Sequence, residues 1–275
     1  MTRTLVFLFF TQLAVGGAWT MLLVPLREAG HSFFRFNGLL AAACLALALW
    51  AGPYRVFGPA GLSALSPQLW IIALFGLCAA ALLAHVWAVL SDRIPWDRRF
   101  LLTAALAGSA ALVGDGLLHR SAQAPLWWET VLLPVFFLTS ALFLGSVCFA
   151  MILGHWYLIS PALSIRPLRR ATRLILVSLT VKGILFGVAL YLYATAADPA
   201  RQQTVRTFLG AGGFFLWARA LFGLVGPAIL SLMIWSTVKI RSTQSATGLL
   251  YVATILVLIG ELLSKFLLYA TSVPV

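Results

Sequence analysis

The chain has 275 residues and a formal net charge of +12 at pH 7, with 62% of its residues hydrophobic and only 9% charged. Soluble domains carry about 25% charged residues, so this chain has too few charges to cover a water-facing surface of its size. The basic residues are spread thinly among the ends of apolar segments, which is unlike the concentrated patch of a nucleic-acid-binding protein. We therefore predict an integral membrane protein whose surroundings are the lipid bilayer, with no nucleic acid as a partner.

Apolar runs long enough to cross a bilayer recur from one end of the chain to the other. A helix of about 20 apolar residues spans the hydrocarbon layer, and helices satisfy their own backbone hydrogen bonds in lipid. The expected spans are residues 4–26, 33–52, 68–91, 99–119, 128–158, 172–196, 207–238 and 246–271. The sequence thus predicts an all-α, polytopic bundle of about eight transmembrane helices, forming one domain over residues 1–275. The fifth and seventh spans are long enough to tilt or to project from the membrane.

The first apolar run continues through Gly16 and Gly17 without a small-residue cleavage site. We therefore expect it to be a span of the mature protein rather than a cleaved signal peptide.

The basic residues predict how the bundle is oriented. One set of connections carries Arg27, Arg35, Arg93, Arg98, Arg99, Arg166, Arg169, Arg170, Arg173, Lys239 and Arg241. The alternate set carries Arg3, Arg55, Arg120, Arg201 and Arg206. Because Lys and Arg are enriched in cytoplasmic loops, the richer set should face the cytoplasm and both termini should face outward.

Three stretches carry a resemblance to a known family. They are FFTQLAVGGAWTMLL at Phe9–Leu23, AGPYRVFGPAGLSALSPQLW at Ala51–Trp70 and IGELLSKFLLYA at Ile259–Ala270. In this order, and on these spans, they resemble the anchor subunit of dimethyl sulfoxide reductase, a family of eight-helix membrane proteins. The resemblance implies a multi-pass protein of the bacterial inner (cytoplasmic) membrane that interacts with quinone, either menaquinone or ubiquinone. It also implies an iron–sulfur subunit and a molybdenum catalytic subunit, or another redox subunit, as partners.

One position departs from the pattern of this family. The family places a histidine shortly before its Pro-x-Arg, whereas the matching position here is Leu49, which is followed by Trp50. Neither side chain exchanges a redox-coupled proton, so the usual route of quinol oxidation would lack one of its reactive groups.

Ionisable residues inside membrane spans are costly and mark either function or paired interior contacts. Quinone chemistry needs hydrogen-bond donors to two ring oxygens and a proton route to water, which a carboxylate near a histidine or lysine supplies. The candidates for quinone binding or proton relay lie in or near the outward half of the spans; they are Arg55, Asp115, His119, Glu129, Glu261 and Lys265.

Two of these pairs are four residues apart and so share a helix face: Asp115 with His119, and Glu261 with Lys265. For the second pair, structural neutralisation and proton relay are equally good interpretations. A solvated helix-end cap is the favoured interpretation of the first pair. Lys182 and Arg219 lie nearer the middle of their spans and should snorkel or pair with an acidic neighbour.

His85 and His155 lie in the inner halves of two different spans. Two neutral imidazoles at matched depth could ligate a b-type haem. Hydrogen-bonded core histidines are the simpler interpretation, so we expect no haem.

The sequence contains no paired-Asp, GxSxG, HExxH or Walker motif, so it predicts no catalytic residues and no metal site of the chain's own. We interpret it as a non-catalytic, quinone-interacting membrane anchor of a respiratory oxidoreductase complex that passes electrons between quinone and its redox partner. Two alternatives stay open: a purely structural membrane subunit that has lost quinone chemistry, which Leu49 favours, and a b-haem electron-transfer subunit using His85 and His155.

Overall fold

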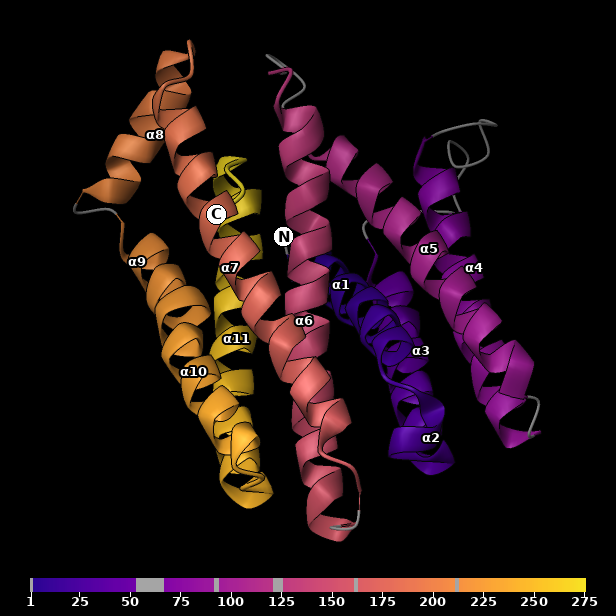
Figure 1. Cartoon of the computed structure of the whole chain (residues 1–275). Coiled ribbons are helices and arrows are strands. Elements are labelled where there is room, and N and C mark those ends of the chain that lie inside the picture. Colours follow the sequence, from indigo (N-terminus) through magenta and orange to yellow (C-terminus); the bar gives the residue numbers. More distant parts are fainter. Residues whose placement is uncertain (1, 53–66, 92–93, 121–125, 161–162, 211–212) are drawn as a thin grey trace.

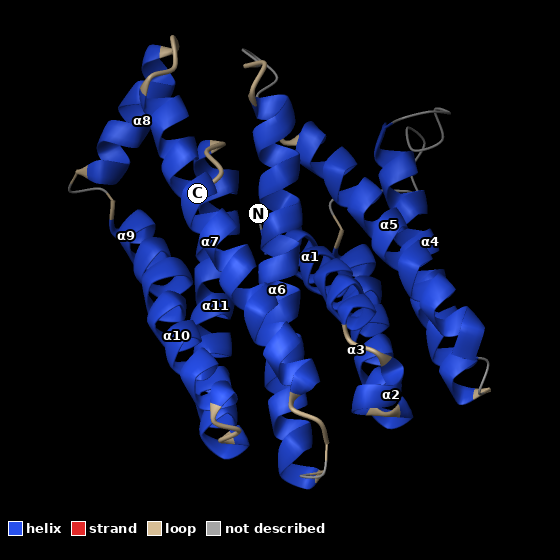
Figure 2. Cartoon of the chain, viewed as in Figure 1, coloured by secondary structure: helices blue, strands red, loops and turns tan. Residues whose placement is uncertain are grey.

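The computed structural model describes residues 2–52, 67–91, 94–120, 126–160, 163–210 and 213–275, and these residues form helices without any strand (Figures 1 and 2). Eight helical segments within this part of the chain are long and apolar enough to cross a membrane. This confirms the prediction of an all-α polytopic bundle. Arg55, one of the predicted site residues, lies outside the described residues.

In chain order, the first half consists of α1 (Thr2–Leu23), the short α2 (Leu26–Ala29), α3 (His31–Ala51), α4 (Pro67–Leu90) and α5 (Ile94–Leu118). The second half consists of α6 (Glu129–Ile159), α7 (Arg166–Ala194), α8 (Pro199–Leu209), α9 (Phe214–Ala220), a π-helical turn at Leu221–Val225, α10 (Gly226–Lys239) and α11 (Thr243–Thr271). The segments α9, the π-helical turn and α10 follow one another without a break and form one span.

Helix α6 is the central element of the bundle. It packs against α1, α3 and α5 of the first half and against α7 and α11 of the second. In Figure 1 it lies between the α1–α5 group and the α7–α11 group.

The contact between α1 and α6 depends on glycine. A Cβ atom on Gly16 would lie 1.7 Å from the carbonyl oxygen of Ala141, and one on Gly145 would lie 2.1 Å from the backbone carbon of Gly16. Small residues let helix backbones approach closely in membranes, where dispersion forces rather than water drive association. These two glycines therefore allow the backbones of α1 and α6 to come into contact.

Large apolar side chains cover the outer faces of the helices. Leu39, Leu106, Val177 and Leu232 are each about half exposed or more. Such a surface is suited to lipid and not to water.

Most span boundaries differ from the sequence prediction by a few residues, and two differ by more. The seventh span was expected to begin at residue 207, but α8 ends at Leu209 as a separate helix and the span begins at Phe214. Helix α8 carries Arg201, Gln202, Gln203 and Arg206, and such a polar segment is costly to place in hydrocarbon. The sixth span begins at Arg166 instead of residue 172, because Pro167 occupies the first turn, where proline is well tolerated, and opens the helix early.

Candidate functional site

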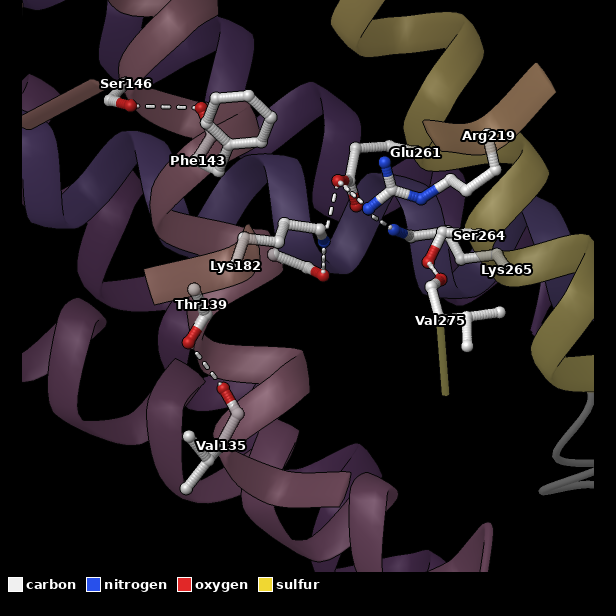
Figure 3. A network of polar contacts seen from close by, with 11 residues as sticks. Val135, Thr139, Phe143, Ser146, Lys182, Arg219, Glu261, Ser264, Lys265 and Val275 are labelled. Atoms are coloured by element: carbon white, nitrogen blue, oxygen red, sulfur yellow. Dashed lines mark hydrogen bonds and ion pairs between the residues drawn. The ribbon is translucent and has the colours of Figure 1, made fainter. Parts of the chain in front are cut away.

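A group of charged side chains lies buried in the second half of the bundle, where α7, α9 and α11 meet. Glu261 and Lys265 come from one face of α11, Lys182 comes from α7 and Arg219 from α9 (Figure 3). We call these four residues the Glu261 cluster. The prediction that Glu261 and Lys265 form a pair on one helix face is confirmed.

Glu261 is the hub of this cluster. Its Oε1 lies 2.6 Å from Nζ of Lys182 and 3.7 Å from NH2 of Arg219. Its Oε2 accepts a hydrogen bond of 2.9 Å from Nζ of Lys265. Lys182 also donates a hydrogen bond to the hydroxyl of Ser140 on α6, so the cluster ties four helices together.

The cluster is both buried and positively charged. Lys182, Arg219 and Glu261 are 0% exposed and Lys265 is 2% exposed, so three cations surround one carboxylate. Buried ions are stable only when they are paired and hydrogen-bonded. None of the guanidinium nitrogens of Arg219 has a hydrogen-bond acceptor among the described residues. The site therefore retains unused positive charge and unused N–H donors.

Glycines make the room that Arg219 occupies. A Cβ atom on Gly223 in the π-helical turn would lie 1.8 Å from NH1 of Arg219, and one on Gly260 would lie 2.3 Å from the Cα of Gly223. The π-helical turn and α11 are thus in backbone contact beside the guanidinium. π-Helical turns occur frequently at functional sites.

An apolar groove of about 380 Å³ lies on the adjoining face of α7. Its wall on α7 includes Leu179 and Gly183, which flank Lys182 in the sequence, and its other wall includes Leu224 and Val225 of the π-helical turn. A Cβ atom on Gly183 would meet nothing within 4 Å. The groove and the Glu261 cluster share α7, and the π-helical turn that lines the groove also lies against Arg219 of the cluster through Gly223.

The predicted site residue Glu129 belongs to a different group. Tyr193 of α7 donates a hydrogen bond of 2.9 Å to its Oε1, and NH2 of Arg201 on α8 lies 3.4 Å from the same atom. Tyr193 and Glu129 are 1% exposed. This group joins the start of α6, the end of α7 and α8.

Asp115 and His119 form a third group on α5. The ring Nδ1 of His119 lies 2.8 Å from the carbonyl oxygen of Asp115 and 3.7 Å from its Oδ1. Asp115 is 0% exposed, so the prediction of a solvated helix-end cap is wrong for this carboxylate. The reason is that the α5 face carrying it packs against α6, where His119 lies against the ring of Phe137.

The described candidates therefore fall into three groups. Sequence reasoning grouped Glu261 with Lys265 correctly but did not attach Lys182 and Arg219 to them. The available signal was that both basic side chains lie deep in spans and so need an acidic partner.

The two histidines considered for haem have different neighbours. His85 is fully buried on α4, with Nδ1 3.2 Å from the carbonyl oxygen of Asp97 and its ring beside Phe34. His155 is exposed on α6, and its Nδ1 lies 2.9 Å from the hydroxyl of Tyr251 on α11. The structure thus places the two imidazoles on different helices, each with its own hydrogen-bond partner.

No protein-family model matches this chain, and no curated protein is significantly similar to it.

Proposed function

We propose that this protein is the quinone-interacting membrane anchor of a respiratory oxidoreductase complex. The observation that carries the proposal is the Glu261 cluster, a buried group of three cations and one carboxylate beside an apolar groove on the outer face of the bundle.

A quinone head group needs hydrogen-bond donors for its two ring oxygens and a source of protons, and the residues of the cluster can supply both. The guanidinium of Arg219 has N–H donors that no described residue uses. Cationic N–H donors stabilise negative charge that develops on such oxygens, most strongly where water is excluded. Glu261 is the counter-charge that holds these cations in place. The ammonium groups of Lys182 and Lys265 are the groups that could deliver a proton to the quinone.

The groove supplies an approach from the lipid. A quinone carries an apolar tail and diffuses in the bilayer, so its path to a buried site must open toward hydrocarbon. The groove between α7 and the π-helical turn does so, and its volume of about 380 Å³ lies within the range of small-molecule sites.

The chain's own residues bind, orient and exchange protons, while the quinone supplies two-electron redox chemistry when bound. Within the described residues, no group of three or more His, Cys, Asp or Glu side chains is arranged to hold a metal ion. In this proposal, electrons are exchanged between the quinone and a redox centre of another subunit. The three stretches that resemble the dimethyl sulfoxide reductase anchor support an iron–sulfur subunit with a molybdenum partner, and the bacterial inner membrane as the location.

The position of the cluster also affects how Leu49, in place of the family's histidine, is interpreted. That residue lies near the end of α3, which packs against α1, α2, α4 and α6, whereas the cluster is formed by α7, α9 and α11. In this proposal the reactive groups come from the second half of the chain instead of from the second span. The rival interpretation, a structural brace without quinone chemistry, is favoured by the near-complete burial of all four side chains.

The groove allows the two interpretations to be separated without disturbing the charges. In the purified complex, Gly183→Leu should fill the groove and lower bound quinone and quinone-linked turnover about tenfold or more, as expected when a ligand loses its access path. Assembly, followed by subunit stoichiometry, should stay unchanged because the position is open.

Gly187→Leu is the matched control. Gly187 lies one turn further along α7, is equally open, and is not among the residues that line this groove. Normal quinone content and turnover in a well-assembled Gly183→Leu complex would refute the proposed route and favour the structural brace.

A further inference from the structure

At the end of the bundle away from α8, two cavities adjoin one another. One, of about 470 Å³, lies between the end of α1, α2, α3, α5 and the start of α7, and the other, of about 410 Å³, runs along α7. Leu23 and Arg170 line both cavities. Together they form one continuous depression, which we call the α1–α7 groove.

The rim of the α1–α7 groove is basic. It includes Arg98 of α5 and Arg170 and Arg173 of α7, and Asp97 beside Arg98 is the one carboxylate among the described residues that line the two cavities. Arg170 has Glu28 at 3.6 Å, in a pair whose arginine side chain is 43% exposed. The guanidinium of Arg173 lies over the ring of Trp235, 5.6 Å from its centroid. Within the described part of the chain, no carboxylate lies within ion-pair distance of Arg98 or Arg173, so the rim has positive charge to spare.

The wall below this rim is apolar and open to the bilayer. On α7 it continues from the arginines through Leu174 and Val177, opposite Leu23 at the end of α1. Leu23 is 49% exposed and Val177 is 60% exposed. An occupant of this groove must therefore be apolar along one part and negatively charged at the other.

We propose that the α1–α7 groove binds an anionic glycerophospholipid. Its phosphate lies against Arg170 and Arg173 with Arg98 at the same rim, and one acyl chain follows Leu23, Leu174 and Val177. Arginine recognises phosphate through paired N–H donors, and basic pockets between transmembrane helices favour anionic head groups. The groove lies at the end of α1 and the start of α7, and none of its lining residues belongs to the Glu261 cluster. The proposal is therefore independent of the quinone function.

Native mass spectrometry of the purified protein in detergent, with its partner subunits if they copurify, provides the test. Phosphatidylglycerol and phosphatidylcholine with identical acyl chains are titrated separately. The wild type should retain phosphatidylglycerol in preference to phosphatidylcholine. Arg170→Gln combined with Arg173→Gln should weaken phosphatidylglycerol binding about tenfold or more, in line with the attraction contributed by each basic residue.

Two further variants make the result specific. Arg3→Gln with Arg206→Gln removes the same charge from exposed residues on α1 and α8 and should leave binding unchanged. Leu23→Trp should block the groove without altering any charge. Leu39→Trp, at an exposed position on α3 outside the groove, should leave lipid binding unchanged. Equal retention of the two lipids by the wild type, or unchanged binding after both Leu23→Trp and the double arginine change, would overturn the proposal.

Discussion

The ammonium group of Lys182 lies 2.6 Å from Oε1 of Glu261, and both side chains are fully buried although they come from α7 and α11. Lys265 and Arg219 approach the same carboxylate. One negative charge therefore holds three positive charges in the buried interior of the bundle.

Glu261→Gln should strongly destabilise the protein. The amide keeps the size of the side chain and accepts hydrogen bonds, but it leaves three buried cations without a counter-charge. Breaking a buried ion pair in this way costs about 3–5 kcal/mol, which should appear as a lower free energy of unfolding in detergent. Glu28→Gln is the matched control, because it removes the carboxylate from the partly exposed pair with Arg170 and should change stability by about 0–1 kcal/mol. Similar losses in the two variants would contradict the burial of the cluster.

Gly16→Ala should loosen the packing of α1 against α6. Its new methyl group would lie 1.7 Å from the carbonyl oxygen of Ala141, so the two backbones must move apart. Overpacking of this kind costs about 1–3 kcal/mol, measurable as a lower melting temperature. Gly17→Ala provides the control at the next residue, since its nearest neighbour would be 4.0 Å away, and it should be neutral or slightly stabilising. An equal response to both substitutions would contradict the backbone contact.

Tyr193→Phe should weaken the junction of α6, α7 and α8. The change removes the hydroxyl that donates to Glu129 and leaves that buried carboxylate with one partner fewer. The expected loss is about 1–3 kcal/mol in the free energy of unfolding. Tyr191→Phe, two residues earlier on the exposed side of α7, should have little effect. If both variants unfold alike, the hydrogen bond to Glu129 contributes nothing to stability.

The orientation of the bundle is a further prediction. If each of the eight apolar spans among the described residues crosses the membrane, both termini lie on one side. The distribution of Lys and Arg predicts that this side faces away from the cytoplasm. Reporter fusions after Val275 should report an outside location and fusions near Arg169 an inside one. The opposite pattern would reverse the orientation and place the α1–α7 groove in the other leaflet.

The sequence predicted the spans well because length and hydropathy are local properties. The apolar run at 246–271, for example, corresponds to α11 at Thr243–Thr271. The pairing of Glu261 with Lys265 was equally accessible, because four residues separate neighbours on one helix face.

The remaining features depend on which helices become neighbours. Nothing local in α7 specifies that Lys182 faces α11, or that Arg219 reaches the same carboxylate across a π-helical turn. Asp115 was expected near water because it lies close to a helix end, yet the contact of α5 with α6 buries it. The boundary of α8 was missed because the apolar residues at its end merged, in a hydropathy profile, with the following span.

The dependence of Lys182 on Glu261 has a consequence for biosynthesis. As the ribosome releases the chain into the membrane, α7 emerges long before α11, so Lys182 enters the lipid without the carboxylate that later neutralises it. A lysine in the centre of an inserting helix opposes its partitioning, and α7 must therefore remain near the insertion machinery, or shield its amine against Ser140 of α6, until the last span is made. A chain that ends between residues 183 and 260 would keep the amine of Lys182 in the bilayer without the carboxylate that neutralises it in the complete bundle.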